Sequence, residues 1–182
     1  KNFGNYKKSI EFYNKVINFV KNDNTSLSEI FYRRGSSYER IGDYKNSDKD
    51  LLKSLELVPN DPYVLNYLAY SWLERNIKIN IAINMLEKAY DKTENDPYIT
   101  DSLGWAYFLN KEYLKAEKYL NLAIQIKPDD PVIMDHYGDS LWMIGRKLQA
   151  SYFWKRVLTS KNLEDIDVEK LKSKIIVGIN NT

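Results

Sequence analysis

The stretch from residue 95 to residue 131, NDPYITDSLGWAYFLNKEYLKAEKYLNLAIQIKPDDP, contains one complete copy of an internal repeat. It opens with Asn-Asp-Pro at 95–97 and closes with Asp-Asp-Pro at 129–131, so the prolines are 131 − 97 = 34 residues apart. Another Asn-Asp-Pro stands at 60–62, and its proline is 97 − 62 = 35 residues upstream. Counting 34 residues further back leads to Ser28, where another helical pattern begins. A period of this length indicates a repeat architecture.

The four units align column by column when Ser28, Pro62, Pro97 and Pro131 are taken as position one, with one extra residue in the second unit. Position eight carries a small residue in every unit: Gly35, Ala69, Gly104 and Gly138. Position twenty is also small, with Ser47, Ala82, Ala116 and Ala150. Position twenty-four is large and apolar, with Leu51, Leu86, Leu120 and Trp154. Because Gly inside a helix costs about 1 kcal/mol relative to Ala, its recurrence needs a reason. We expect two helices to approach most closely there, so that a large side chain would overpack the contact.

Each unit is therefore expected to form a helix, a tight turn and a second helix. The turns are expected near 42–43, 111–112 and 145–146, and the aspartates that precede the three prolines are expected to cap the first helices. The pattern resembles the tetratricopeptide repeat, and the residues that carry the resemblance best are Leu103, Gly104, Tyr107, Tyr113, Ala116, Leu120, Ala123 and Pro128. Arg34, in a usually apolar column, and an inserted residue near 77–79 depart from it.

The resemblance implies an all-α fold, a right-handed superhelical solenoid of antiparallel helix hairpins with a C-terminal capping helix. Residues 1–27 match the second helix of a truncated unit and a connector, so we expect more sequence upstream. Residues 163–182 are expected to form the cap, with a helix over 167–177 whose apolar face carries Val168, Leu171, Ile175 and Ile176, and Gly178 as its stop. The complete units are expected at 28–61, 62–96, 97–130 and 131–162.

Composition argues against several classes of function. Lys plus Arg number 27 and Asp plus Glu 25, with both signs interspersed, which disfavours nucleic acid as a partner. Cysteine is absent, no apolar run approaches the roughly 20 residues of a membrane-spanning helix, and the glycines have no phosphate-loop spacing. The single histidine, His136, follows Asp135, but adjacent helical residues do not face each other, so we expect an ordinary surface or groove residue. No catalytic, cofactor or metal site is predicted, and the chain is not expected to be an enzyme.

By resemblance to the family, positions two, five, nine and twelve of each first helix line a concave face. These columns contain tyrosine, tryptophan and carboxylates and no Lys or Arg, and the predicted partner-binding residues are Tyr63, Asn66, Tyr70, Tyr98, Asp101, Trp105, Asp135 and Asp139. Such a groove favours a protein or peptide with apolar and basic residues. The alternative is that the aromatic residues only fill seams between repeats, above all Phe108 and Trp142. The basic residues of a carboxylate clamp and the asparagine ladder of some sugar-transferase repeats are missing.

The leading hypothesis is a protein–protein interaction scaffold or adaptor that binds a peptide or extended segment on the concave face. Two alternatives stay open. The chain could be a self-assembly module, or it could be a regulatory or recruiting arm of a larger enzyme or cell-envelope protein. The stretches 101–107 and 130–139 resemble those of bacterial tetratricopeptide proteins, which leaves both the cytoplasm and the cell envelope open as locations.

Overall fold

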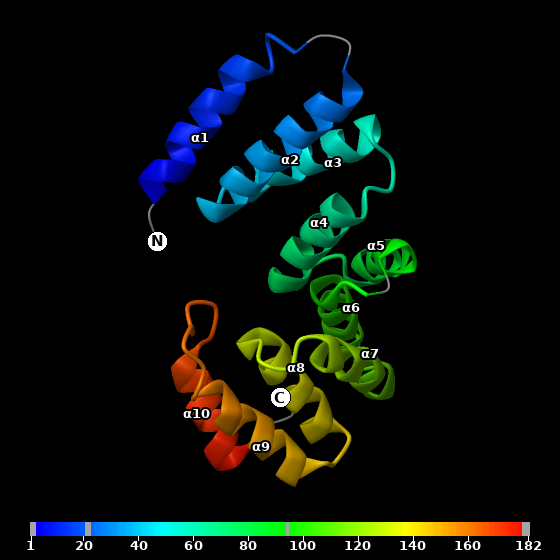
Figure 1. Cartoon of the computed structure of the whole chain (residues 1–182), viewed down its shortest axis with the longest axis vertical. Coiled ribbons are helices and arrows are strands. Elements are labelled where there is room, and N and C mark those ends of the chain that lie inside the picture. Colours follow the sequence, from blue (N-terminus) through cyan, green and yellow to red (C-terminus); the bar gives the residue numbers. More distant parts are fainter. Residues whose placement is uncertain (1–2, 21–22, 94, 180–182) are drawn as a thin grey trace. The chain divides into compact units, whose positions relative to one another are not determined.

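A computed structural model describes residues 3–20, 23–93 and 95–179, and these residues form ten α-helices and no β-strand. The chain divides into two compact units, residues 1–89 and 90–182, and the boundary lies within the fifth helix. Figure 1 labels the helices in chain order. Their bounds are α1 Phe3–Val16, α2 Asn24–Arg40, α3 Tyr44–Leu57, α4 Pro62–Glu74, α5 Ile79–Lys92, α6 Pro97–Leu109, α7 Tyr113–Ile126, α8 Pro131–Met143, α9 Lys147–Val157 and α10 Val168–Val177.

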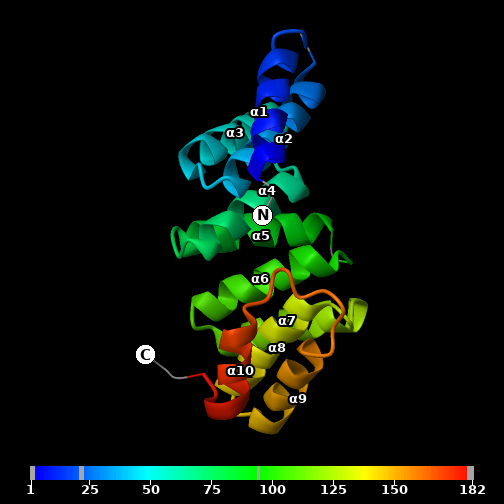
Figure 2. The same cartoon turned by 90° about the vertical axis from the view of Figure 1, so that its left-hand side faces the viewer.

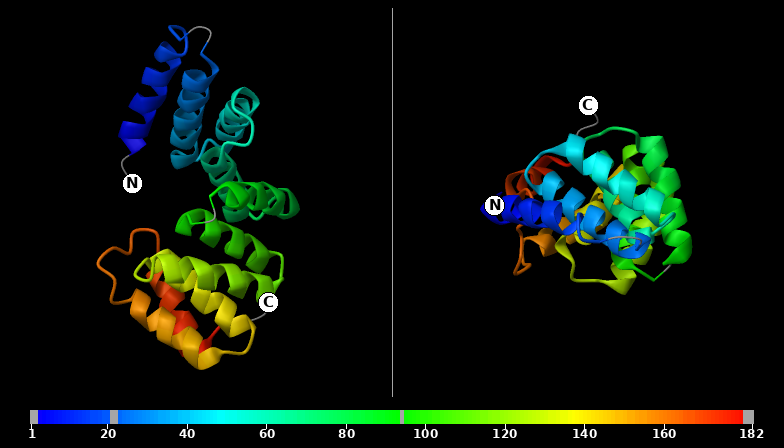
Figure 3. Two further views of the ribbon diagram at one scale, coloured as in Figure 1. Left: turned by 45° about the vertical axis from the view of Figure 1, so that its right-hand side comes forward. Right: turned by 90° about the horizontal axis from the view of Figure 1, so that it is seen from above.

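Three pairs of consecutive helices among the described residues pack as hairpins, as the repeat pattern predicts for them. Within the first unit α2 packs against α3, and within the second α6 packs against α7 and α8 against α9 (Figures 1 and 3). The connections within these three hairpins are residues 41–43, 110–112 and 144–146. The connection after α4 is residues 75–78, one residue longer, and thus the structure places the predicted insertion in a turn.

The predicted caps are confirmed at three helices. Asp61, Asp96 and Asp130 each accept hydrogen bonds from two backbone N–H groups of the first turn of α4, α6 and α8, with the proline at the start of the helix. The expected helix start at Ser28 is wrong, because α2 begins at Asn24 and is capped by Asp23. Ser28 is buried inside α2, and its hydroxyl donates to the Ser54 carbonyl at 3.0 Å.

The small residues at position eight lie where the two helices of a hairpin come closest. A methyl group added at Gly104 would lie 2.6 Å from Cγ of Leu120 and 3.1 Å from its backbone nitrogen. One added at Gly138 would lie 2.5 Å from Nε1 of Trp154. The opposing residue stands sixteen positions later in each hairpin, because position eight of the first helix faces position twenty-four of the second. The close approach that the sequence predicts is therefore present, and Leu120 and Trp154 are fully buried by it.

The C-terminal helix α10 packs beside α9 in the second unit (Figure 2). Asp167 caps it and Gly178, at φ +79°, ends it, as the sequence predicts. The predicted apolar face is only partly right. Leu171 is buried, but Ile176 is 80% exposed, and the side chain that takes a buried place on α10 is Lys174.

We predict that Gly104→Ala lowers the free energy of unfolding by about 1–3 kcal/mol, because the added methyl group would overlap Leu120. The intrinsic helix preference of Ala, worth up to about 1 kcal/mol, offsets only part of this. Gly35→Ala is the matched control, since its methyl group would meet Leu51 at 3.0–3.2 Å and needs a smaller shift. Urea denaturation followed by circular dichroism measures both, and a Gly104 variant as stable as the wild type would contradict the overlap.

A second prediction concerns the turn between α6 and α7. Lys111 has φ +63° where the corresponding turns have Gly42 at +82° and Gly145 at +86°. A side chain in this left-handed region costs about 1–2 kcal/mol. Lys111→Gly should therefore stabilise the chain by about 1 kcal/mol, read as a higher urea midpoint with an unchanged slope. Lys118→Gly, in the interior of α7, should instead destabilise it.

Candidate interaction surface

The surface of interest is the set of side chains at positions two, five, nine and twelve of the first helices, here called the first-helix face. In the second unit α6 and α8 contribute to it and contact each other. Trp105 of α6 stacks on His136 of α8 with ring centroids 4.1 Å apart, and on Phe108 at 4.8 Å. The aromatic residues of α6 therefore take part in repeat packing, which is the alternative that the sequence leaves open for Phe108.

Asp101 and His136 form a buried pair across α6 and α8. Nδ1 of His136 lies 2.9 and 3.0 Å from the two carboxylate oxygens of Asp101, and both residues are less than a tenth exposed. Burial opposes protonation of the imidazole, but the charge of Asp101, the hydrogen bond to it, and the charges of Asp135 and Asp139 outweigh burial, so the pKa of His136 is raised. The expectation of an ordinary surface or groove histidine is wrong, because its partner comes from the preceding repeat.

Asp135 and Asp139, one turn apart on α8, both bind the ammonium group of Lys174 from α10. Its Nζ donates to both oxygens of each carboxylate, at 2.8 Å to Asp135 and 2.7–2.8 Å to Asp139. Asp139 also accepts from the indole N–H of Trp154 at 2.9 Å. Burial raises the pKa of Asp139 to about 6 despite Lys174. Burial alone would lower the pKa of Lys174, but the two carboxylates raise it. Lys174 and Asp139 are therefore both charged at pH 7.

Trp142 holds the end of α10. Its indole N–H donates to the carbonyl of Ile179 at 3.2 Å. A Cβ on Gly178 would overlap the Trp142 ring, so only a residue without a side chain fits beneath it. Trp142 is thus neither a free groove residue nor a seam between two repeats, since it packs against the capping segment.

The remaining predicted residues differ in exposure. Tyr63 and Tyr98, both at position two, are 55% and 50% exposed. Tyr98 lies under the ammonium of Lys127, 4.2 Å from the ring centroid, and its hydroxyl oxygen accepts a hydrogen bond from that ammonium. Tyr70 and Asn66 on α4 are partly buried. The oxygen of Asn66 is one of the buried polar atoms in the described part of the chain that lack a hydrogen-bond partner.

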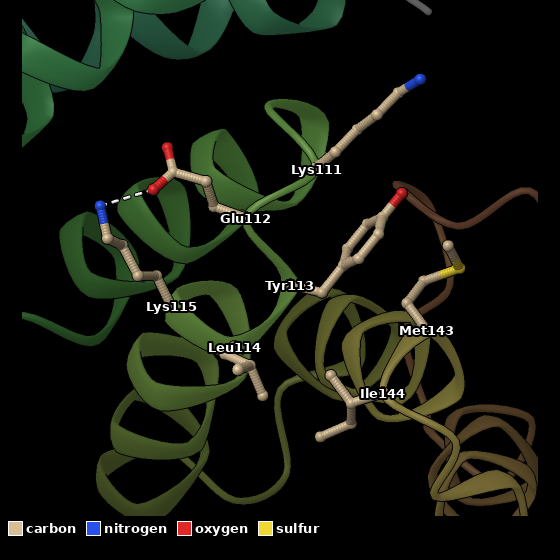
Figure 4. Close-up of a pocket in the computed structure, with 7 residues that line it drawn as sticks. All are labelled: Lys111, Glu112, Tyr113, Leu114, Lys115, Met143 and Ile144. Carbon is tan, nitrogen blue, oxygen red and sulfur yellow. Dashed lines mark ion pairs between the residues drawn. The ribbon is translucent and has the colours of Figure 1, made fainter.

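An open hollow of about 540 Å³ lies away from these residues, between the turn before α7 and the end of α8. Figure 4 shows Lys111 directed away from it and an ion pair between Glu112 and Lys115 on its rim. Its lining is Lys111, Glu112, Tyr113, Leu114, Lys115, Met143 and Ile144. Because its single carboxylate is already paired with a lysine, the hollow offers no pair of groups for acid–base catalysis.

Two further features bear on function. In the part of the chain that the structure describes, no helix is both long and apolar enough to cross a membrane. The same residues contain no group of three or more histidine, aspartate or glutamate side chains placed to hold a metal ion.

Two important residues escaped the sequence-based prediction. Both residues, His136 and Lys174, pair with carboxylates of the first-helix face. His136 contacts Asp101, 35 residues earlier in the chain, and Lys174 contacts Asp135, 39 residues earlier. His136 stands at position six, and Tyr67 at the same position of another repeat also contacts position five of the preceding first helix, Tyr32. Nothing in the local sequence distinguished Lys174 from Lys170 and Lys172, which lie on the same short helix.

Comparison with known proteins agrees with this geometry. The tetratricopeptide repeat family matches residues 28–61 and 102–130. The "TPR repeat-containing protein PA4667" of Pseudomonas aeruginosa is 31% identical over 110 residues, which are 60% of this chain and 18% of that protein. The "Anaphase-promoting complex subunit CDC16" of Saccharomyces cerevisiae is 35% identical over 66 residues, 36% of this chain and 8% of that protein. The matches therefore span less than a fifth of these relatives.

Solved structures show the same fold at low sequence identity. MamA from Desulfovibrio magneticus RS-1, residues 41 to the end, has a TM-score of 0.73 at 20% identity, and 89% of each chain is covered. A thermophilic TPR protein from Thermus thermophilus, TTC0263, has a TM-score of 0.73 at 18% identity, covering 96% of this chain and 92% of that one. The chain therefore contains tetratricopeptide repeats at residues 28–61 and 102–130, and its fold is the all-α repeat fold. This fold is a non-catalytic scaffold that generally mediates protein–protein interactions.

The buried His136 generates a prediction about pH. Its folded pKa lies above the unfolded value near 6.5, so its contribution to stability is complete below about pH 6.5 and is lost as the pH rises through the folded pKa. The raised pKa of Asp139 changes the free energy of unfolding only at lower pH, between about 3.8 and about 6. That of Lys174, raised above 10.5, acts only at higher pH. Between pH 6.5 and 9 the free energy of unfolding should therefore fall, and in His136→Gln it should stay level.

Because the chain has a single histidine, its imidazole proton signals can be followed by NMR without ambiguity. We expect a pKa above 6.5 in the wild type and a lower pKa in Asp101→Asn, because the charge and the hydrogen bond of Asp101 are lost. Asp129→Asn, on an exposed carboxylate that pairs with Arg156, is the control and should leave the titration unchanged. A wild-type pKa at or below 6.5 would contradict the pairing.

Proposed function

We propose that the chain binds extended protein segments on the first-helix face, with Tyr63 as the anchor within the first unit and Tyr98 as a separate anchor within the second. The observation that carries the proposal is the repeated exposure of a large aromatic side chain at position two. The position-twenty-four residues Leu51, Leu86 and Leu120 are fully buried, yet both position-two tyrosines stay about half exposed. Tyrosine gives a large contact area at a low cost in conformational entropy and is enriched among residues that dominate binding energy.

The chemistry of the segment follows from what the chain leaves unsatisfied. Asp101, Asp135 and Asp139 already have cationic partners within the chain, so they do not by themselves call for a basic ligand. Tyr98 and its neighbour Lys127 offer an apolar ring face beside a cation. We propose that a segment bound at either tyrosine presents apolar or aromatic side chains to it. Tyr70 and Trp105, partly buried on the same helices, would add contact area beside them.

The test begins with peptides selected from a random displayed library against the whole chain, whose affinities are then measured by fluorescence polarisation. Tyr98→Ala and Tyr63→Ala should each weaken the best peptides by about tenfold or more, since an anchor contributes at least about 1–2 kcal/mol. Tyr152→Ala is a matched control on the second helix α9. That tyrosine is 57% exposed and, like Tyr98, lies under a basic side chain, Arg156.

The control should change peptide affinity by less than about twofold. Circular dichroism of each variant checks that helicity is retained. If every selected peptide binds the two position-two variants as tightly as the wild type, the anchors are not on the first-helix face and the proposal fails.

A further inference from the structure

The C-terminal segment contacts α8 through Lys174 and the chain just after α10, and it packs against α9, in the manner of a ligand on a receptor. Three points hold the segment in place. Leu171 is 1% exposed, Lys174 reaches the carboxylates of Asp135 and Asp139, and the chain just after the helix passes under Trp142. Each point uses a different interaction: apolar burial, charge pairing, and a hydrogen bond combined with a steric fit.

The receptor side of these contacts is the first-helix face of the last repeat. Asp135, Asp139 and Trp142 stand at positions five, nine and twelve, the columns that the family uses for partners. In this unit α10 covers them, and Figure 2 shows α10 beside α8 and α9. The capping segment therefore occupies the place that a partner would take on this repeat.

The charges here specify a cationic ligand. Without Lys174, the two carboxylates of α8 would lie near a third, Asp101, whose hydrogen-bond partner is the imidazole of His136. Leaving such carboxylates buried and unpaired costs several kcal/mol, so the site strongly favours an ammonium or guanidinium group. The fit under Trp142 adds a second requirement, because a Cβ at the position of Gly178 would overlap its ring. The matching ligand has an apolar residue, a lysine three positions later and a glycine four positions after that.

The segment is attached weakly enough to leave. Of the ten residues of α10, only Leu171 and Lys174 are buried, and Ile176 and Val177 point outward at 80% and 58% exposure. A helix of this length is not stable alone in water. The linker 158–167 is mainly exposed. Terminal elements with few buried apolar contacts open at a lower free energy than the whole fold.

We propose that α10 is a displaceable internal ligand, and that a lysine-bearing helical segment of a partner protein replaces it on α8. This goes beyond the proposed function, because the site, its residues and its ligand chemistry differ from those of the position-two tyrosines. While the tether keeps the local concentration of α10 high, weak or poorly matched segments do not compete. A partner segment with the same pattern at sufficient concentration displaces α10 and takes its contacts.

The probe is a fluorescein-labelled synthetic peptide with the sequence of residues 163–182 of this chain, whose fit to the site is known. It is titrated into the wild-type chain and into two variants that loosen the internal segment without changing the site. Gly178→Ala collides with Trp142, and Lys174→Gln removes the ammonium group. Both loosened chains should bind the peptide at least about tenfold more tightly than the wild type, because the resident competitor is weakened.

Two controls test the recognition itself. A peptide with Lys174→Gln should bind the Gly178→Ala chain at least about tenfold more weakly than the unmodified peptide. Adding Asp135→Asn and Asp139→Asn to that chain should have a similar effect, while Asn at 139 keeps an oxygen that can accept from Trp154. Circular dichroism checks that the variants are folded. Peptide binding that depends on Tyr98 should be retained in them, which separates this test from that of the proposed function.

Three results would overturn the proposal. The loosened chains could bind the peptide no better than the wild type, which would mean that α10 does not block a site. The peptide lacking the lysine could bind equally well, which would remove the charge recognition. Sizing of the wild type could show a dimer that Lys174→Gln dissociates, which would mean that α10 docks on a second copy and not on its own chain.

Discussion

The close approach of two helices at position eight is the constraint on which the rest of the structure depends. Where Gly104 faces Leu120 and Gly138 faces Trp154, the absence of a side chain on one helix lets a large one be buried on the other. That contact fixes the rotation of each first helix about its axis. Position five, one helical turn before position nine, carries Asp101 in α6 and Asp135 in α8, whose carboxylates meet His136 and Lys174 and not the second helix of their own hairpin. The first-helix face exists because the opposite side of the same helices is packed so tightly.

The amount of structure that could be predicted from the sequence follows from how local the determining interactions are. The caps at Asp61, Asp96 and Asp130 and the turn glycines act within a few residues, and the alignment of small and large columns extends over one repeat. These features were predicted. The start of α2 was not, because Asp23 caps an extra turn that lies outside the repeat period. The inserted residue near 77–79 was recognised from the period alone and lies in the turn after α4.

The predicted interaction residues illustrate the limit of a column-based argument. A position in a repeat fixes which way a side chain faces, but it does not fix what it meets there. Asp101 and Asp139 stand in the columns predicted to bind a partner, but they are buried, because His136 and Lys174 approach them from other helices. The position-two tyrosines, by contrast, keep about half of their surface exposed. Charge is especially hard to predict in this way, since a carboxylate is stabilised equally by a partner protein and by a distant residue of its own chain.

The burial of Lys174 also has a chemical consequence. It is the only lysine among the described residues whose side chain is buried, and its two carboxylates raise its pKa above the ordinary value. An amine reacts with acylating or alkylating agents only after losing its proton, and only when the reagent can reach it. Docked α10 therefore protects one amine of the chain both sterically and by protonation. The acetylation or labelling state of that single nitrogen records whether the segment has left its place on α8.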